Sequence, residues 1–133
     1  MTRAIPLFLN ESIERKYGFS RAVLCDRLLF VSGTVGIDAS GAVVGKGEMA
    51  RQVAQAYENL RTILECAGAT AADVVKETIF TTDIGCFLNE SHARHDFYAC
   101  GLPPATTGVE VRRLALPELM VEIELVAYLG GSD

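Results

Sequence analysis

Two glutamates near the C-terminal end of the chain have the spacing that acid–base chemistry uses. In residues 119–129, LMVEIELVAYL, every second residue from Leu119 to Leu125 is a branched apolar residue, and Met120, Glu122, Glu124 and Val126 alternate with them. This period of two predicts a β-strand. Glu122 and Glu124 then share one face of that strand, where mutual repulsion and burial tend to raise the pKa of one carboxyl group. Glu122 is the candidate proton carrier. The alternative for either glutamate is a solvated or ion-paired strand residue.

A threonine pair stands where a rigid loop becomes a second strand. Pro103 and Pro104 fix φ and remove two amide donors, so we expect the strand of residues 106–113 to begin only after Pro104. Thr106 and Thr107 lie at the mouth of this strand, and their hydroxyls can both donate to and accept from a ligand. The alternative is that both are ordinary strand-forming residues.

Two histidines and four cysteines complete the set of reactive residues. His92 and His95 have i, i+3 spacing, but a metal site needs three or four ligands, and no further ligand is in register. We therefore expect solvated helix surface and no metal. The cysteines are far apart and show no CxxC spacing, so we expect a reducing compartment, the cytoplasm. They are Cys25, Cys66, Cys86 and Cys100.

The length and composition exclude several classes of protein. A chain of 133 residues fits one domain, 1–133, and half of its residues are hydrophobic. No apolar run approaches the ~20 residues of a membrane span, and no export signal is evident, so we expect no membrane partner. The net charge of −5, without a cluster of lysines and arginines, argues against a nucleic-acid partner.

Hydrophobic periodicity predicts the elements that position these residues. The segment 20–33 indicates a hairpin, with a turn at residues 25–27 and an end at Gly33. Spacings of three and four predict a helix over 48–67 with Gly68 after it, and Thr70 with Asp73 resembles a capping motif before a strand over 74–83. A second helix is predicted over 86–100, followed by the two strands above.

The predicted order is ββαβαββ in an α+β fold. Both helices connect strands, so right-handed crossovers place them on one face of a single mixed sheet. The other face stays uncovered, and the apolar content exceeds what two helices can cover. Burial between identical subunits is the expected solution.

Three separated segments resemble the Rid/YjgF family of reactive-intermediate deaminases. They are FVSGTVGID, NLRTILECAGATAADVVKETIFTTD and PPATTGVEVRRLALPELMVEIELVAY, and together they span most of the chain. The resemblance implies a chorismate-mutase-like fold and a homotrimer whose bare sheet faces form a central barrel, with ligand clefts between subunits. It also implies hydrolysis of enamines and imines to carbonyl compounds and ammonia, without metal or organic cofactor.

The family's functional residues carry over only in part. Thr106 stands where well-known members have an arginine that binds the substrate carboxylate, and Gly108 stands where cysteine is common. Phe19 replaces a cleft tyrosine, although Tyr17 is two residues away, and Ser91 falls near a position that is often asparagine. Ser32 and Gly33 are retained, and the resemblance implies that their backbone bonds the carboxylate.

Glu122 is retained as well, and the resemblance implies that it holds the attacking water. A guanidinium offers the bidentate geometry that suits a carboxylate, so Arg21, which follows GFS, is the candidate replacement for the missing arginine. Arg112 and Arg113 are alternatives. Each of the three can instead be a surface arginine in an ion pair.

Two functions remain open from the sequence. The first is a deaminase of an enamine or imine metabolite with altered substrate preference, which the retained Glu122 favours. The second is a non-catalytic protein that binds small carbonyl or carboxylate metabolites, which the missing arginine favours.

Overall fold

The computed structural model describes residues 4–130, which form six β-strands and four α-helices. In chain order these are β1 (Ala4–Leu7), α1 (Glu11–Tyr17), β2 (Ala22–Cys25), β3 (Leu28–Val35), α2 (Met49–Cys66), β4 (Val74–Thr81), α3 (Ile84–Asn89), α4 (His92–Phe97), β5 (Ala105–Glu110) and β6 (Val121–Tyr128). One turn of 3₁₀-helix, η1 (Ala71–Asp73), precedes β4.

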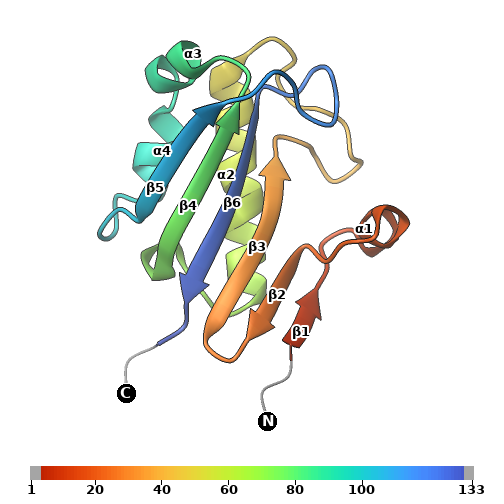
Figure 1. Cartoon of the computed structure of the whole chain (residues 1–133), viewed down its shortest axis with the longest axis vertical. Helices are drawn as coiled ribbons and strands as arrows, with labels where there is room; N and C mark the ends of the chain where they lie inside the picture. The colour runs from red at the N-terminus through yellow and green to blue at the C-terminus, as the bar shows by residue number, and fades with distance from the viewer. Residues whose placement is uncertain (1–3, 131–133) are drawn as a thin grey trace.

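All six strands belong to one mixed sheet in the order β1-β2-β3-β6-β4-β5. Strands β4 and β5 are parallel and every other pair of neighbours is antiparallel. Figure 1 shows α2 crossing behind the sheet, with α3 and α4 also behind it, while α1 stands beside the β1 edge. The sheet face toward the viewer in Figure 1 carries no helix, as the sequence predicts.

The core lies between α2 and the sheet. Alternate residues of β6 point into it, so that Val121, Ile123, Leu125 and Ala127 are all buried. Helix α2 contributes its predicted apolar stripe, which includes Val53, Ala56, Leu60, Ile63 and Leu64. The pleat then sends Glu122, Glu124, Val126 and Tyr128 to the uncovered face.

Local turn chemistry explains several element boundaries. Asp26 takes a positive φ of 57° between β2 and β3, which gives the tight turn of the predicted hairpin. Gly68 has φ 78° just after α2, and Thr70 with Asp73 forms a full capping box. The strand predicted over residues 106–113 lies at Ala105–Glu110, so it begins one residue earlier and ends three residues sooner than the alternation indicates.

Three of the sequence predictions need correction. The pattern gives no element before residue 20, yet β1 and α1 lie there, because a four-residue edge strand and a seven-residue helix are too short to show periodicity. The predicted helix over 86–100 is two helices, broken at Glu90 and Ser91. The Ser91 hydroxyl donates to the Leu88 carbonyl (3.4 Å), a local bond that competes with helix continuation.

The third correction concerns β3, which continues past Gly33 to Val35. The observed order differs from the predicted ββαβαββ because β1 and α1 precede the hairpin and because α3 and α4 replace the second helix. The α+β class and the helix-free face agree with the prediction. Among residues 4–130, none of the helices combines the length and hydropathy that crossing a bilayer requires.

Candidate active site

A β-bulge in β3 creates the first part of the candidate site. Val31 pairs with Leu125 and Thr34 pairs with Ile123, so β3 has one residue more than β6 between these two pairs. Ser32 and Gly33 form the bulge. A bulge of this kind redirects side chains and is common beside active sites.

Glu122 lies directly over the bulge. A methyl group added at Gly33 would collide with the Glu122 carboxylate, so glycine is the residue that lets the carboxylate rest there. The Glu122 side chain is half-buried, and within residues 4–130 it receives no hydrogen bond. Burial raises the pKa of Glu122, the charge of Glu124 raises it further, and Arg21 partly opposes both.

Arg21 holds the bulge in place. Its Nε donates to the buried Glu14 carboxylate (2.9 Å) and its Nη1 donates to the Gly33 carbonyl (3.1 Å). The guanidinium carbon lies 5.0 Å from the centre of the Phe19 ring, within cation–π range. Arg21 therefore connects α1 to the bulge, and its role as a substrate-binding residue stays a prediction.

The Ser32 side chain and amide are both bonded within the chain. Its hydroxyl donates to the Ser20 carbonyl (2.7 Å) and its amide donates to the Arg21 carbonyl (3.0 Å). These bonds attach the bulge to the segment before β2. The structure thus brings Phe19, Arg21, Ser32, Gly33 and Glu122 together.

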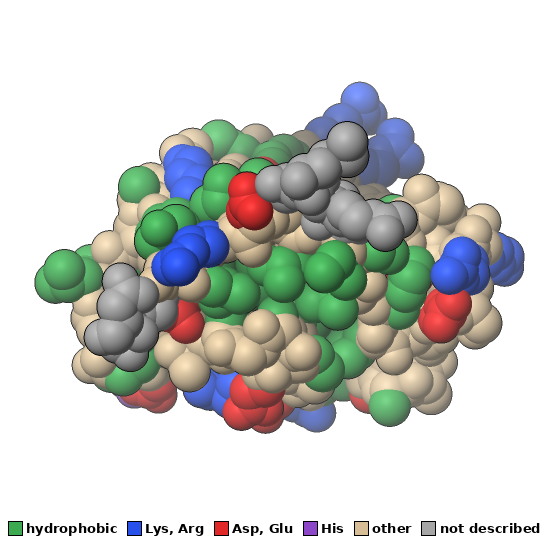
Figure 2. All heavy atoms as spheres, turned by 90° about the horizontal axis from the view of Figure 1, so that it is seen from below, with side chains coloured by type: hydrophobic (Ala, Val, Ile, Leu, Met, Phe, Trp, Pro, Cys, Tyr) green, Lys and Arg blue, Asp and Glu red, His purple; other side chains and the backbone are tan. Residues whose placement is uncertain are grey.

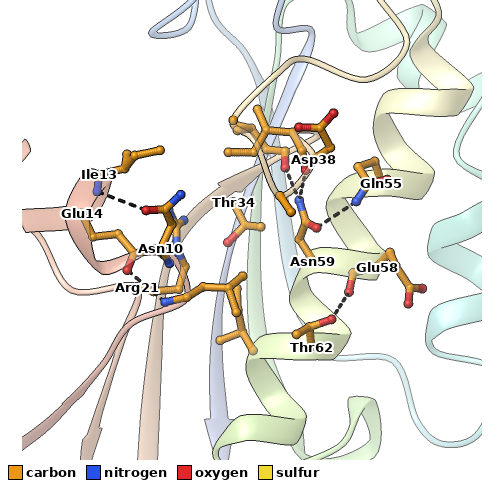
Figure 3. Close-up of a pocket in the computed structure, with 16 residues that line it drawn as sticks. Asn10, Ile13, Glu14, Arg21, Thr34, Asp38, Gln55, Glu58, Asn59 and Thr62 are labelled. Carbon is orange, nitrogen blue, oxygen red and sulfur yellow. Dashed lines mark hydrogen bonds and ion pairs between the residues drawn. The ribbon is translucent and has the colours of Figure 1, made fainter.

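A cavity of about 460 Å³ lies beside this cluster, between α1, the end of β3 and α2 (Figure 3). Arg21 lines the cavity and also bonds the Gly33 carbonyl, so one side chain reaches both places. On the α2 side, Asn59 donates to the carbonyls of Val35 and Ile37 (2.9 Å each), which fixes the loop that follows β3. Arg21 therefore fixes α1 to the β3 bulge, and Asn59 fixes the end of β3 to α2.

A second carboxylate cluster lies on the opposite, helix-covered face. Glu77 in β4 is fully buried and accepts hydrogen bonds from Tyr57 and Tyr98 (2.7 Å each) and from Arg94 Nε (2.8 Å). Burial raises the pKa of both tyrosines, and Glu77 raises it further, so they stay neutral donors. Burial opposes the charge of Arg94, but Glu77 outweighs it and the pKa of Arg94 is raised.

Thr106 belongs to this second cluster. It pairs with Glu77 across the parallel β4–β5 ladder, accepts a hydrogen bond from Arg94 Nη2 (2.9 Å) and bonds the Pro104 carbonyl (2.9 Å). Thr107 faces the other way and accepts from Lys76 Nζ (2.9 Å). The side chains of Thr106 and Thr107 therefore lie on different faces of the sheet.

The strand register separates Thr106 from Glu122. Glu122 pairs with Phe80 and Glu124 pairs with Thr78, whereas Thr106 pairs with Glu77, one position out of phase. Within one chain the two residues lie on opposite faces of the sheet. Ser91 is buried at the start of α4, one turn before Arg94, and is not part of the Glu122 cluster.

Sequence reasoning missed Glu77, Arg94 and Tyr57. The signal for Glu77 was present, because a lone glutamate at an inward position of the apolar segment VVKETIF needs a buried cation and hydrogen-bond donors. No local spacing identifies those donors, which come from α2 and α4.

The fold and the bulge-supported carboxylate define a small α+β protein with a cavity of about 460 Å³ beside the cluster that holds a candidate acid–base group. Residues 10–129 match the family model described as Endoribonuclease L-PSP. The chain therefore belongs to this family, the YjgF/RutC or Rid family, which confirms the resemblance of its sequence segments.

Several relatives are similar along most of their length. A RutC family protein of Pyrococcus horikoshii is 36% identical over 112 residues, covering 83% of this chain and 86% of the relative. The 2-iminobutanoate/2-iminopropanoate deaminase of Rattus norvegicus is 38% identical over 115 residues, covering 84% and 80%. The crystal structure of a YjgF/YER057c/UK114 family member from Mycobacterium tuberculosis has a TM-score of 0.81 at 32% identity, covering 95% and 99%.

Proposed function

We propose that this protein hydrolyses a reactive enamine or imine metabolite to a carbonyl compound and ammonia, with a substrate preference altered from that of family members with the β5 arginine. The observation that carries the proposal is the half-buried Glu122 carboxylate over the Gly33 bulge, whose pKa is raised mainly by burial. Relatives named as imine deaminases support the same reaction class.

Glu122 can perform both proton transfers of this reaction. An enamine first tautomerises to the imine. Water then adds to the imine carbon, forming the C–O bond, and the proton it loses passes to the Glu122 carboxylate. The protonated Glu122 returns this proton to the nitrogen, which gives a carbinolamine. Glu122 then carries the hydroxyl proton of the carbinolamine to the same nitrogen, the C–N bond breaks, and ammonia leaves as the carbonyl forms.

The proposal includes a homotrimer with its clefts between subunits. On the uncovered sheet face, Phe30 and Tyr128 are each nearly half exposed (46% and 48%), an unusual setting for large apolar side chains that favours a covering subunit. Figure 2 shows a different surface, the end of the molecule where β3 and β4 begin, and hydrophobic side chains gather across the middle of this end as well. Glu122 and Thr106 lie on opposite faces of the sheet within one chain. A site between two subunits would allow Glu122 of one subunit to lie near Thr106 of another.

The activity test compares two neighbouring glutamates. A short 2-imino acid is generated in situ, and keto-acid and ammonia release are measured above the spontaneous rate. We expect Glu122→Gln to lower kcat/KM by about 10²- to 10⁴-fold, the usual contribution of an acid–base group. The matched control is Glu124→Gln on the same face, expected to stay within a few-fold. Equal rates for the wild type and Glu122→Gln would contradict the proposal.

The assembly test uses the exposed apolar face. Light scattering at micromolar concentration should give the mass of three chains for the wild type, and Phe30→Glu should shift it to the monomer because a charge would be buried in the contact. Ala50→Glu on the exposed side of α2 is the control and should remain a trimer. A wild-type monomer would rule out this arrangement.

A further inference from the structure

Arg94 is an arginine held at the exposed edge of the sheet by a buried partner. Its Nε is bonded to Glu77, which is fully buried, and its Nη2 is bonded to Thr106 on β5, where every residue is exposed. The Arg94 side chain keeps 17% of its surface exposed. The guanidinium thus extends from the interior to solvent beside the first residues of β5.

The interior end of Arg94 is fixed by three side chains. Glu77 Oε2 accepts from both Tyr57 and Tyr98, which leaves Oε1 for Arg94. The guanidinium carbon also lies 5.3 Å from the centre of the Tyr98 ring. A cation fixed in this way loses little further rotamer freedom when it binds a ligand.

The exposed end of Arg94 retains hydrogen-bonding capacity. A guanidinium has five N–H donors, and the bonds of Arg94 to residues 4–130 use two of them, those to Glu77 and Thr106. Thr106 is small and accepts the hydrogen bond from Nη2 at 2.9 Å. The other candidate, Arg21, is fixed between Glu14 and the Gly33 carbonyl on the other cluster.

We propose that Arg94 binds the anionic group of the substrate, so that the cation is supplied by α4 beside Thr106 and not by β5 itself. This inference rests on the proposed function and names the residue that determines specificity for a carboxylate-bearing substrate. Glu77, Tyr57 and Tyr98 act as positioning residues, since they set the direction of the guanidinium.

The test measures binding, so that it does not depend on turnover. Calorimetry compares 2-oxobutanoate, the anionic carbonyl product, with its uncharged methyl ester. The variants are Arg94→Lys, which keeps the charge but loses the planar fork, and the double variant Glu77→Gln with Arg94→Met, which removes both charges and leaves no buried ion unpaired. Arg61→Met is the control, because Arg61 also lies over an α4 aromatic ring, that of Phe97.

We expect the double variant to bind 2-oxobutanoate about 10- to 100-fold more weakly, as for a lost charge-assisted contact, with ester binding unchanged. Arg94→Lys should fall between the double variant and the wild type, and Arg61→Met should match the wild type. Unchanged preference for the acid over the ester in Arg94→Lys and the double variant would overturn the inference.

The two proposals fail in different ways. Loss of activity in Glu122→Gln together with unchanged acid preference in the Arg94 variants would remove the role of Arg94 and keep the deaminase. Activity unaffected by Glu122→Gln, with acid preference lost in the Arg94 variants, would keep the anion site and remove the reaction.

Discussion

Glu77 in β4 and Glu122 in β6 lie on opposite faces of the same sheet, and their carboxylates have very different partners. Glu77 is fully buried and accepts hydrogen bonds from two tyrosines and an arginine. Glu122 is half-buried over a glycine bulge, receives no hydrogen bond within residues 4–130, and has a raised pKa. A buried carboxylate that accepts three hydrogen bonds fixes structure, whereas one that accepts none within the described residues can exchange protons with water and substrate.

The largest expected effect comes from mixing two defective chains. If one site uses Glu122 from one subunit and Arg94 from another, chains with Glu122→Gln and chains with the double variant, Glu77→Gln and Arg94→Met, should form some intact sites when they are unfolded together and refolded. With equal amounts and random assembly, roughly a quarter of the sites combine both native residues, so activity should return to about that fraction of wild type. Ammonia release is the measurement.

The control for this experiment is the same pair refolded separately and then combined without exchange. That sample should stay at the activity of the two parents. If the co-refolded sample is trimeric and yet no more active than the separately refolded one, Glu122 and Arg94 do not share a site between subunits.

The second effect concerns stability, and it separates the two glutamates. Glu77→Gln leaves Arg94 without its counter-charge, and we expect a loss of about 3 kcal/mol in the free energy of unfolding, as for a broken buried pair. Urea denaturation followed by circular dichroism measures it. Glu122→Gln is the matched comparison and should be at least as stable as wild type.

The sign for Glu122 follows from its raised pKa. Its ionised form is less favoured in the folded than in the unfolded state, so the group lowers stability at neutral pH and ceases to do so as pH falls through the raised value. Glutamine removes this cost. If Glu122→Gln lowered the free energy of unfolding more than Glu77→Gln does, the proposed difference between the two glutamates would be wrong.

The third effect tests the bulge. Gly33→Ala should displace the Glu122 carboxylate, because the new methyl group would occupy its position, and the flexible side chain can move without unfolding the strand. We expect kcat/KM to fall about 10- to 100-fold, the cost of misplacing a reacting group by around an ångström, with little change in the midpoint of unfolding. Gly101→Ala, in a loop where ordinary contact is available, is the control.

The smallest effect is a shift along the pH axis. Glu122 must be ionised to accept a proton, so kcat/KM should fall as pH drops through its raised pKa, at a higher pH than for an ordinary carboxyl group. Glu124→Gln removes one cause of the raised pKa and should move this limb to lower pH. An unmoved limb would mean that the charge of Glu124 does not reach the site.

Local pattern in the sequence was enough for several parts of the fold and site. The three- and four-residue spacing defined α2, the turn at Asp26 defined the hairpin, and alternation in β6 put Glu122 and Glu124 on one face. These features depend on neighbours within a turn or a strand, where side-chain direction follows directly from the backbone period.

The tertiary structure alone decided the features that depend on register between distant strands. The extra residue at Ser32 and Gly33 exists only relative to β6, about ninety residues later, and it places the bulge beneath Glu122. Likewise Thr106 faces Glu77 because β5 pairs with β4 in one register, and a shift of one residue would turn it to the Glu122 side. The partners of Glu77 come from helices packed across the core, and no periodicity within β4 specifies which side chains those helices present there.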